Sequence, residues 1–133
     1  MPDISIKYEG NLRTTATHLK SGSIISTDAP IDNKGKGEKF SPTDLFATAL
    51  GSCMLTIMGI TAQAHGFSID GSNIEIDKKM EKNPRRVSYI KIIININGEF
   101  SNKEKQLLMN AARHCPVSKS IHSDIKEEIV FNF

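Results

Sequence analysis

The chain has 133 residues, of which 38% are hydrophobic and 24% are charged, as is ordinary for a soluble globular protein. We therefore expect a single domain over residues 1–133, large enough to bury one core. The formal net charge is +2 and tryptophan is absent, so neither nucleic acid nor an anionic membrane is expected as a partner. We also expect no apolar run of the roughly 18 residues that a membrane span needs, and no signal peptide, so the predicted location is cytoplasmic.

The first 28 residues predict an antiparallel meander of three short strands. Alternating and β-branched residues are interrupted by turn signals, of which Ser21-Gly22 is the clearest. A polar loop rich in glycine and lysine follows over 28–39, and loops of this length are often functional. The predicted strands cover 2–9, 12–19 and 23–27.

A long apolar helix with a well-marked start is predicted next. Ser41 is a natural N-cap, Pro42 suits the first helical position and Asp44 completes a capping-box pattern. Gly51 and Gly59 interrupt the apolar stripe, and each weakens a helix by about 1 kcal/mol relative to alanine. We therefore expect another backbone to approach closely at these two glycines.

The second half of the sequence predicts two strands, a second helix and a closing strand. Strands are expected over 67–77 and 87–100, with Asn83-Pro84 in the turn between them. Ser101 and Glu104 form a second capping box, and an apolar stripe that ends at Cys115 follows them. The closing strand is expected over 125–133.

Two cysteines, each in its own predicted helix, are the most informative residues. Cys53 and Cys115 are 62 positions apart (115 − 53), which excludes a CxxC redox loop and a zinc knuckle. Both fall on the apolar side of their helices. Such a pair can be inert core residues, a structural disulfide or a two-cysteine redox centre, and in a reducing cytosol a disulfide is more often catalytic than structural.

A reactive thiol in this setting needs a cation beside it. The thiolate is the reactive form of cysteine and burial disfavours it, but the helix around Cys53 has no basic residue over 45–64. Arg13, in an early strand, is the foremost candidate to supply the charge. Cys115 is expected at the C-terminal end of its helix, where the macrodipole disfavours an anion and a resolving role is favoured. If Pro116 instead opens a new short helix, Cys115 becomes its N-cap and the effect is reversed.

Three segments carry a family resemblance: FSPTDL over 40–45, GSCM over 51–54 and HCPVS over 114–118. Together they resemble the OsmC/Ohr family, the osmotically induced protein C and organic hydroperoxide resistance proteins, and the resemblance covers essentially the whole chain. It implies an intertwined α+β homodimer in which antiparallel sheets wrap around central helices. It also implies two active sites at the subunit interface.

The resemblance further implies a thiol-dependent peroxidase. Its substrate would be an organic hydroperoxide, its reductant an external dithiol, and no metal, haem or flavin would be needed. By position, Cys53 matches the peroxidatic cysteine, Cys115 the resolving cysteine and Arg13 the activating arginine.

The chain departs from the family pattern at one position. The best-characterised branches carry a glutamate directly after the proline of the helix opening, where this chain has Thr43. Asp44 and Glu38 are the candidates to orient the arginine in its place. The departure also favours an alternative from another class, a non-catalytic dimer that binds a small apolar ligand.

Overall fold

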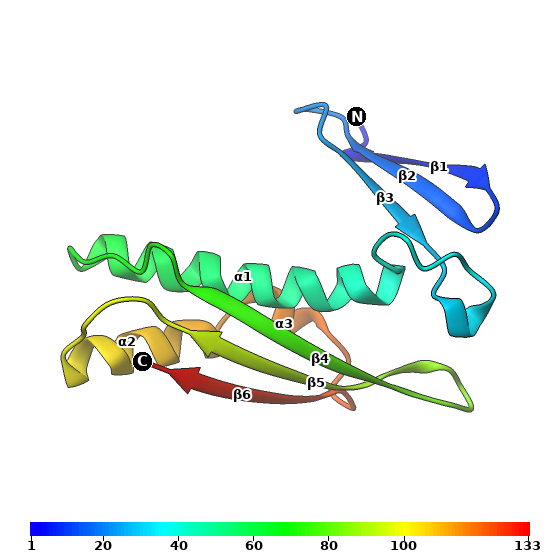
Figure 1. Cartoon of the computed structure of the whole chain (residues 1–133). Coiled ribbons are helices and arrows are strands. Elements are labelled where there is room, and N and C mark those ends of the chain that lie inside the picture. The colour runs from blue at the N-terminus through cyan, green and yellow to red at the C-terminus, as the bar shows by residue number, and fades with distance from the viewer. The chain divides into compact units, whose positions relative to one another are not determined.

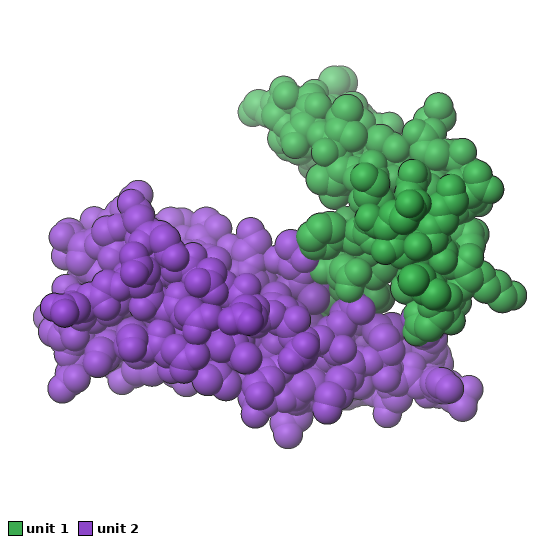
Figure 2. All heavy atoms as spheres, viewed as in Figure 1, with its two compact units in different colours: residues 1–46 green, residues 47–133 purple.

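The computed structural model describes residues 1–133 as an α+β protein with six strands in two sheets and three α-helices (Figure 1). This confirms the expected fold class. The chain forms two compact units, Met1–Phe46 and Ala47–Phe133, which are called unit 1 and unit 2 (Figure 2).

Unit 1 is built on the predicted antiparallel meander. Its sheet has the order β1-β2-β3, and every ladder in it is antiparallel. The third strand begins and ends one residue later than expected, and its last residue, Asp28, pairs with Arg13 across the β2–β3 ladder. The loop after it contains a short 3₁₀ turn, η1 (Ile31–Asn33). The strands are β1 (Ile4–Gly10), β2 (Arg13–His18) and β3 (Ile24–Asp28).

The helix α1 (Pro42–Ala64) begins where the capping pattern predicts. The Asp44 N–H donates to Ser41 Oγ at 3.0 Å, and the Ser41 N–H donates to the Asp44 carboxylate at 3.0 Å. These reciprocal bonds satisfy two of the backbone donors that a helix start leaves without intrahelical partners.

The length of α1 corrects the expectation about apolar runs. The helix has 23 residues, and an 18-residue window within it has a mean hydropathy of 1.7, so by length and composition alone it could cross a membrane. No such run was expected from the sequence, because polar residues interrupt the apolar ones. All of the polar residues after Asp44 are uncharged, so the mean hydropathy of the window stays high. The core helix of a soluble protein passes the same test, and one such helix is weak support for a span.

Unit 2 contains a mixed three-stranded sheet of order β4-β5-β6. β4 (Asn73–Glu81) and β5 (Arg86–Asn95) are antiparallel, whereas β5 and β6 (Lys126–Asn132) are parallel. A parallel pair needs a long crossover, which α2 (Asn102–Arg113) and α3 (Pro116–Ser120) supply. The sequence reading expected antiparallel pairing throughout and began β4 too early, since residues 67–72 form turns and irregular structure.

The core of unit 2 lies against one face of this sheet. Every second residue along β5 points to that face, and Ile90, Ile92 and Ile94 are fully buried there. The second helix starts with the predicted capping box of Ser101 and Glu104. The helices contribute the fully buried side chains of Leu50, Met54, Met58 and Leu108.

The two glycines of α1 have different surroundings. A Cβ atom at Gly51 would lie 2.7 Å from Cδ1 of Ile76 and 3.3 Å from Cγ2 of Ile74, so α1 packs closely on β4 at this point. The approach that was expected is therefore present at Gly51, although side chains make it rather than backbone. At Gly59 the expectation is wrong, because nothing lies within 4 Å of the corresponding Cβ position.

Candidate functional site

The two cysteines lie side by side in unit 2. The two thiols lie close enough that Cys53 affects the ionisation of Cys115, and both are free rather than bridged. Cys53, in the middle of α1, is partly exposed, whereas Cys115 is fully buried. The pair therefore combines one cysteine that is partly open to solvent with one that is not.

Cys115 occupies the N-cap of α3 rather than the end of α2. The helix α2 ends at Arg113, and Pro116 is the first residue of α3. The Ser118 N–H donates to Cys115 Sγ at 3.2 Å. This corrects the expectation that a helix C-terminus faces the thiol, because backbone donors rather than carbonyl groups are directed at it.

Burial dominates the protonation of Cys115. Loss of solvent raises the pKa of the Cys115 thiol, the Ser118 N–H opposes that shift, and the adjacent Cys53 thiol adds to it. The net direction is upward, so Cys115 is held as a neutral thiol at neutral pH. A neutral, buried thiol is suited to the second step of a two-cysteine reaction rather than to the first attack.

A hydrogen-bonded pair fixes the short helix that Cys115 caps. Ser118 Oγ donates to both carboxylate oxygens of Glu127, at 2.9 and 3.0 Å. The pair ties α3 to β6. Sequence reasoning singled out the segment that contains Ser118 but not Glu127, because no local pattern indicates which residue of a later strand lies opposite a short helix.

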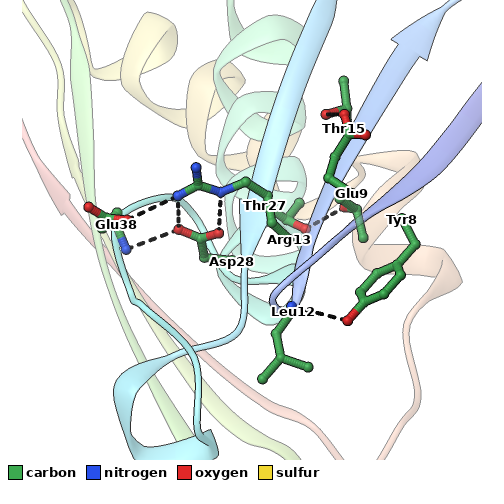
Figure 3. Close-up of polar contacts among 9 residues, drawn as sticks. Tyr8, Glu9, Leu12, Arg13, Thr15, Thr27, Asp28 and Glu38 are labelled. Atoms are coloured by element: carbon green, nitrogen blue, oxygen red, sulfur yellow. Dashed lines mark hydrogen bonds and ion pairs between the residues drawn. The ribbon is translucent and has the colours of Figure 1, made fainter.

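Arg13 is held by two carboxylates within unit 1 (Figure 3). Its Nε donates to Asp28 Oδ1 at 2.7 Å and its Nη2 donates to Asp28 Oδ2 at 2.8 Å. The same Nη2 donates to Glu38 Oε1 at 3.1 Å, and the Glu38 N–H donates to Asp28 Oδ2 at 3.2 Å. The Asp28 side chain is fully buried, whereas those of Arg13 and Glu38 are 31% and 63% exposed. The guanidinium thus has a fixed orientation, since a two-point fork to one carboxylate allows little rotation.

The electrostatics of this cluster keep it ionised. The Arg13 guanidinium holds the pKa of the Asp28 carboxyl below its usual range, against the opposing effect of burial. Asp28 in turn raises the already high pKa of Arg13. Arg13 is therefore a permanent cation.

The carboxylates around Arg13 were only partly expected. Glu38 contacts the arginine, as a residue that orients it would, and Asp44 forms the capping box of α1. Sequence reasoning missed Asp28, which was assigned to the loop. The register of the β2–β3 hairpin around its turn at Ser21 was the signal that could have placed Asp28 opposite Arg13.

A shallow groove of about 270 Å³ lies between α1 and β4 in unit 2. Apolar side chains and small residues line most of it, beside the close contact at Gly51. The structure contains no group of three or more His, Cys, Asp or Glu side chains that could hold a metal ion. The groove is lined by Thr48, Gly51, Ser52, Leu55, Ile74 and Ile76.

These features define a class, an α+β protein with two sheets and a pair of adjacent, unbridged thiols. The model of the OsmC-like protein family matches residues 35–130, well over half of the chain. The protein belongs to the OsmC-like family.

Individual relatives agree with this assignment. The chain is 32% identical over 104 residues to an uncharacterized protein of Methanocaldococcus jannaschii, in an alignment that covers 72% of this chain and 53% of the relative. It therefore spans about half the length of that curated relative.

Solved structures show the same fold over nearly the whole chain. A protein of Psychrobacter arcticus 273-4, described as a proposed osmotic stress induced and detoxification response protein, is 49% identical with a TM-score of 0.96, covering 99% of this chain and 96% of its own. An organic hydroperoxide resistance protein OsmC from Legionella pneumophila is 16% identical with a TM-score of 0.77, and the match covers 98% of this chain and 96% of the Legionella chain. The second likeness is one of fold alone.

Proposed function

We propose that the protein is a thiol-dependent peroxidase that reduces organic hydroperoxides through Cys53 and Cys115. The observation that carries the proposal is the pair of adjacent free cysteines, of which only Cys53 is partly exposed. Family membership supports the same chemistry, since related structures are described as organic hydroperoxide resistance proteins.

The reaction takes place in two oxidative steps and one reductive step. The Cys53 thiolate attacks the distal peroxide oxygen, the O–O bond breaks, and the alkoxide leaves and takes a proton to become an alcohol. The Cys115 sulfur then attacks the resulting Cys53 sulfenic acid, so that a disulfide forms and water leaves. An external dithiol is oxidised to its own disulfide and returns both cysteines to thiols.

Arg13 belongs to the proposal as the activating cation. Its position in the sequence matches the activating arginine of the family, and its charge is permanent and oriented by Asp28 and Glu38. The two carboxylates supply the support that the family glutamate would give where this chain has Thr43.

The proposal includes a homodimer in a reducing, cytoplasmic setting. Its structural support is an apolar strip on one face of the unit 1 sheet, where Ile4, Ile6 and Tyr8 are 58%, 68% and 63% exposed. Ile25 shares that face, since it pairs with Ala16, which pairs with Ile6. Contiguous exposed apolar surface of this kind marks interaction sites. Sedimentation that shows only a folded monomer at micromolar concentration contradicts this part.

One observation favours the alternative of a non-catalytic ligand-binding protein. The groove between α1 and β4 offers a mostly apolar surface that a small apolar molecule could occupy. On that alternative, ligand binding would persist in a Cys53→Ser variant and no peroxide would be consumed.

The test is a steady-state peroxidase assay. Purified protein receives cumene hydroperoxide or hydrogen peroxide, with either dihydrolipoamide or a thioredoxin system as electron donor. The proposal predicts consumption of the organic peroxide in preference to hydrogen peroxide, and no consumption by Cys53→Ser. Equal rates for the wild-type and Cys53→Ser proteins would exclude the peroxidase.

A further inference from the structure

The Ser118–Glu127 pair has no part in the chemistry described so far. Ser118 makes two kinds of contact: its hydroxyl donates to both oxygens of Glu127, and its backbone N–H donates to Cys115 Sγ. All three residues belong to unit 2. Through one serine, the buried sulfur is linked to α3 and α3 is linked to β6.

The link matters because α3 is only five residues long. A single helical turn has few internal hydrogen bonds and does not hold its own shape well. An N–H in such a turn keeps its direction toward the sulfur only if another element fixes the turn. The Glu127 carboxylate, presented by β6, provides that fixed point.

The exposure of the two sulfurs decides which one a reductant attacks in the Cys53–Cys115 disulfide. Cys115 is fully buried and Cys53 is partly exposed, so the thiolate of an external dithiol reaches the Cys53 sulfur. The S–S bond breaks, a mixed disulfide forms between the reductant and Cys53, and the electron pair leaves on the Cys115 sulfur. The second thiol of the reductant then displaces the Cys53 thiolate and completes the reductant's own disulfide.

We propose that Ser118 and Glu127 are positioning residues for this reductive step, an inference that rests on the proposed peroxidase function. They hold the Ser118 N–H on the Cys115 sulfur and so stabilise the thiolate that leaves. A less basic leaving thiolate departs faster, and hydrogen bonds to a charged sulfur are stronger than those to a neutral one.

The first test needs no peroxide. In a Cys53→Ser protein, Cys115 is the sole thiol, and the ¹³Cβ NMR shift of labelled cysteine follows its ionisation without any need for solvent access. Adding Ser118→Ala should move the titration midpoint upward by roughly half a pH unit or more, which is about a threefold loss of thiolate at a given pH. Ser118→Thr, which keeps a hydroxyl, should restore most of the original midpoint.

The chain offers a matched control in the same helix. Ser120 Oγ donates to the Pro116 carbonyl at 2.8 Å, and Ser120→Ala removes an equivalent hydroxyl. When Ser120→Ala is added to the Cys53→Ser protein, the titration midpoint of Cys115 should equal that of Cys53→Ser alone. Glu127→Ala breaks the same link but also removes a negative charge near the sulfur, so it should raise the midpoint by less than Ser118→Ala does. In the Ser118→Ala background, where the link is already broken, Glu127→Ala should not raise the midpoint further. Equal shifts for Ser118→Ala and Ser120→Ala, or no shift for either, would overturn the inference.

The second test measures the disulfide in the protein that retains both cysteines. The rate at which excess dithiothreitol reduces the disulfide should be about twofold to threefold lower in Ser118→Ala than in the wild-type and Ser120→Ala proteins, because the leaving thiolate is less stabilised. An unchanged rate would contradict the inference. If the wild-type protein consumes no peroxide while the midpoint shift and the slower reduction are both observed, the peroxidase proposal fails and the positioning role of Ser118 stands.

Discussion

Replacement of Gly51 by alanine tests how closely α1 is held against β4. Alanine gains about 1 kcal/mol of helix propensity over glycine. The new Cβ would lie 2.7 Å from Cδ1 of Ile76, closer than van der Waals contact allows, and 3.3 Å from Cγ2 of Ile74. Overpacking of this kind costs about 1–3 kcal/mol, so we expect Gly51→Ala to change the free energy of unfolding by about 0 to −2 kcal/mol.

A double-mutant cycle with Ile76→Val isolates the contact. That change removes the Cδ1 atom and alone should cost about 0.5–1.5 kcal/mol. In the Gly51→Ala background it relieves the clash, so its cost should fall by about 1 kcal/mol or become a gain. Urea unfolding of the four proteins, all at the same protein concentration, provides the free energies of unfolding. Strict additivity would refute the reasoning and show that the end of the Ile76 side chain moves away from the new Cβ atom without cost.

The remaining predictions concern the charged cluster and the thiols. Cys53→Ser should abolish peroxide reduction, whereas Cys115→Ser should still form one sulfenic acid per chain, detected by trapping and mass spectrometry; labelling at Cys115 in the first variant would mean that the roles are inverted. Arg13→Ala alone would leave the buried Asp28 carboxylate without its partner, so it is combined with Asp28→Asn and compared with Asp28→Asn alone. The double variant should reduce peroxide more slowly at neutral pH. Its rate should partly recover at alkaline pH, where a thiolate forms unaided. An unchanged pH–rate profile would assign the activating cation to another residue. Because Arg13 lowers the pKa of Asp28, the stabilisation from this pair is present above the unfolded value of about 3.9 and lost as the pH falls through the lower folded value. The advantage of the wild-type protein over Asp28→Asn in thermal unfolding should therefore shrink on acidification from pH 6 to 3, and a constant difference would show that the ion pair does not stabilise the fold.

Local signals in the sequence predicted local structure well. The capping boxes that begin α1 and α2 were recognisable because Ser41 and Ser101 are each followed three residues later by an acidic residue. The meander of unit 1 was recognisable from its turn and its β-branched residues. The adjacency of Cys53 and Cys115 could be expected from the paired motifs, but composition and periodicity alone left three readings of the two cysteines open.

The features that were missed depend on contacts between distant segments. Asp28 meets Arg13 only through the hairpin register, and Glu127 meets Ser118 only because β6 lies parallel to β5. The N-cap position of Cys115 depended on whether Pro116 ended one helix or began another, which the sequence permits equally. Apolar periodicity likewise identified α1 but could not say which of its glycines another element would contact.

The central claim is that Cys53 and Cys115 form one redox centre, and a single-turnover experiment tests it most directly. Fully reduced protein is mixed with one equivalent of cumene hydroperoxide per chain, quenched by alkylation and digested without reductant for peptide mass spectrometry. The account predicts one alcohol released per chain and an intramolecular disulfide between the Cys53 and Cys115 peptides. Recovery of both cysteines in the alkylated thiol form, with the hydroperoxide intact, would contradict it.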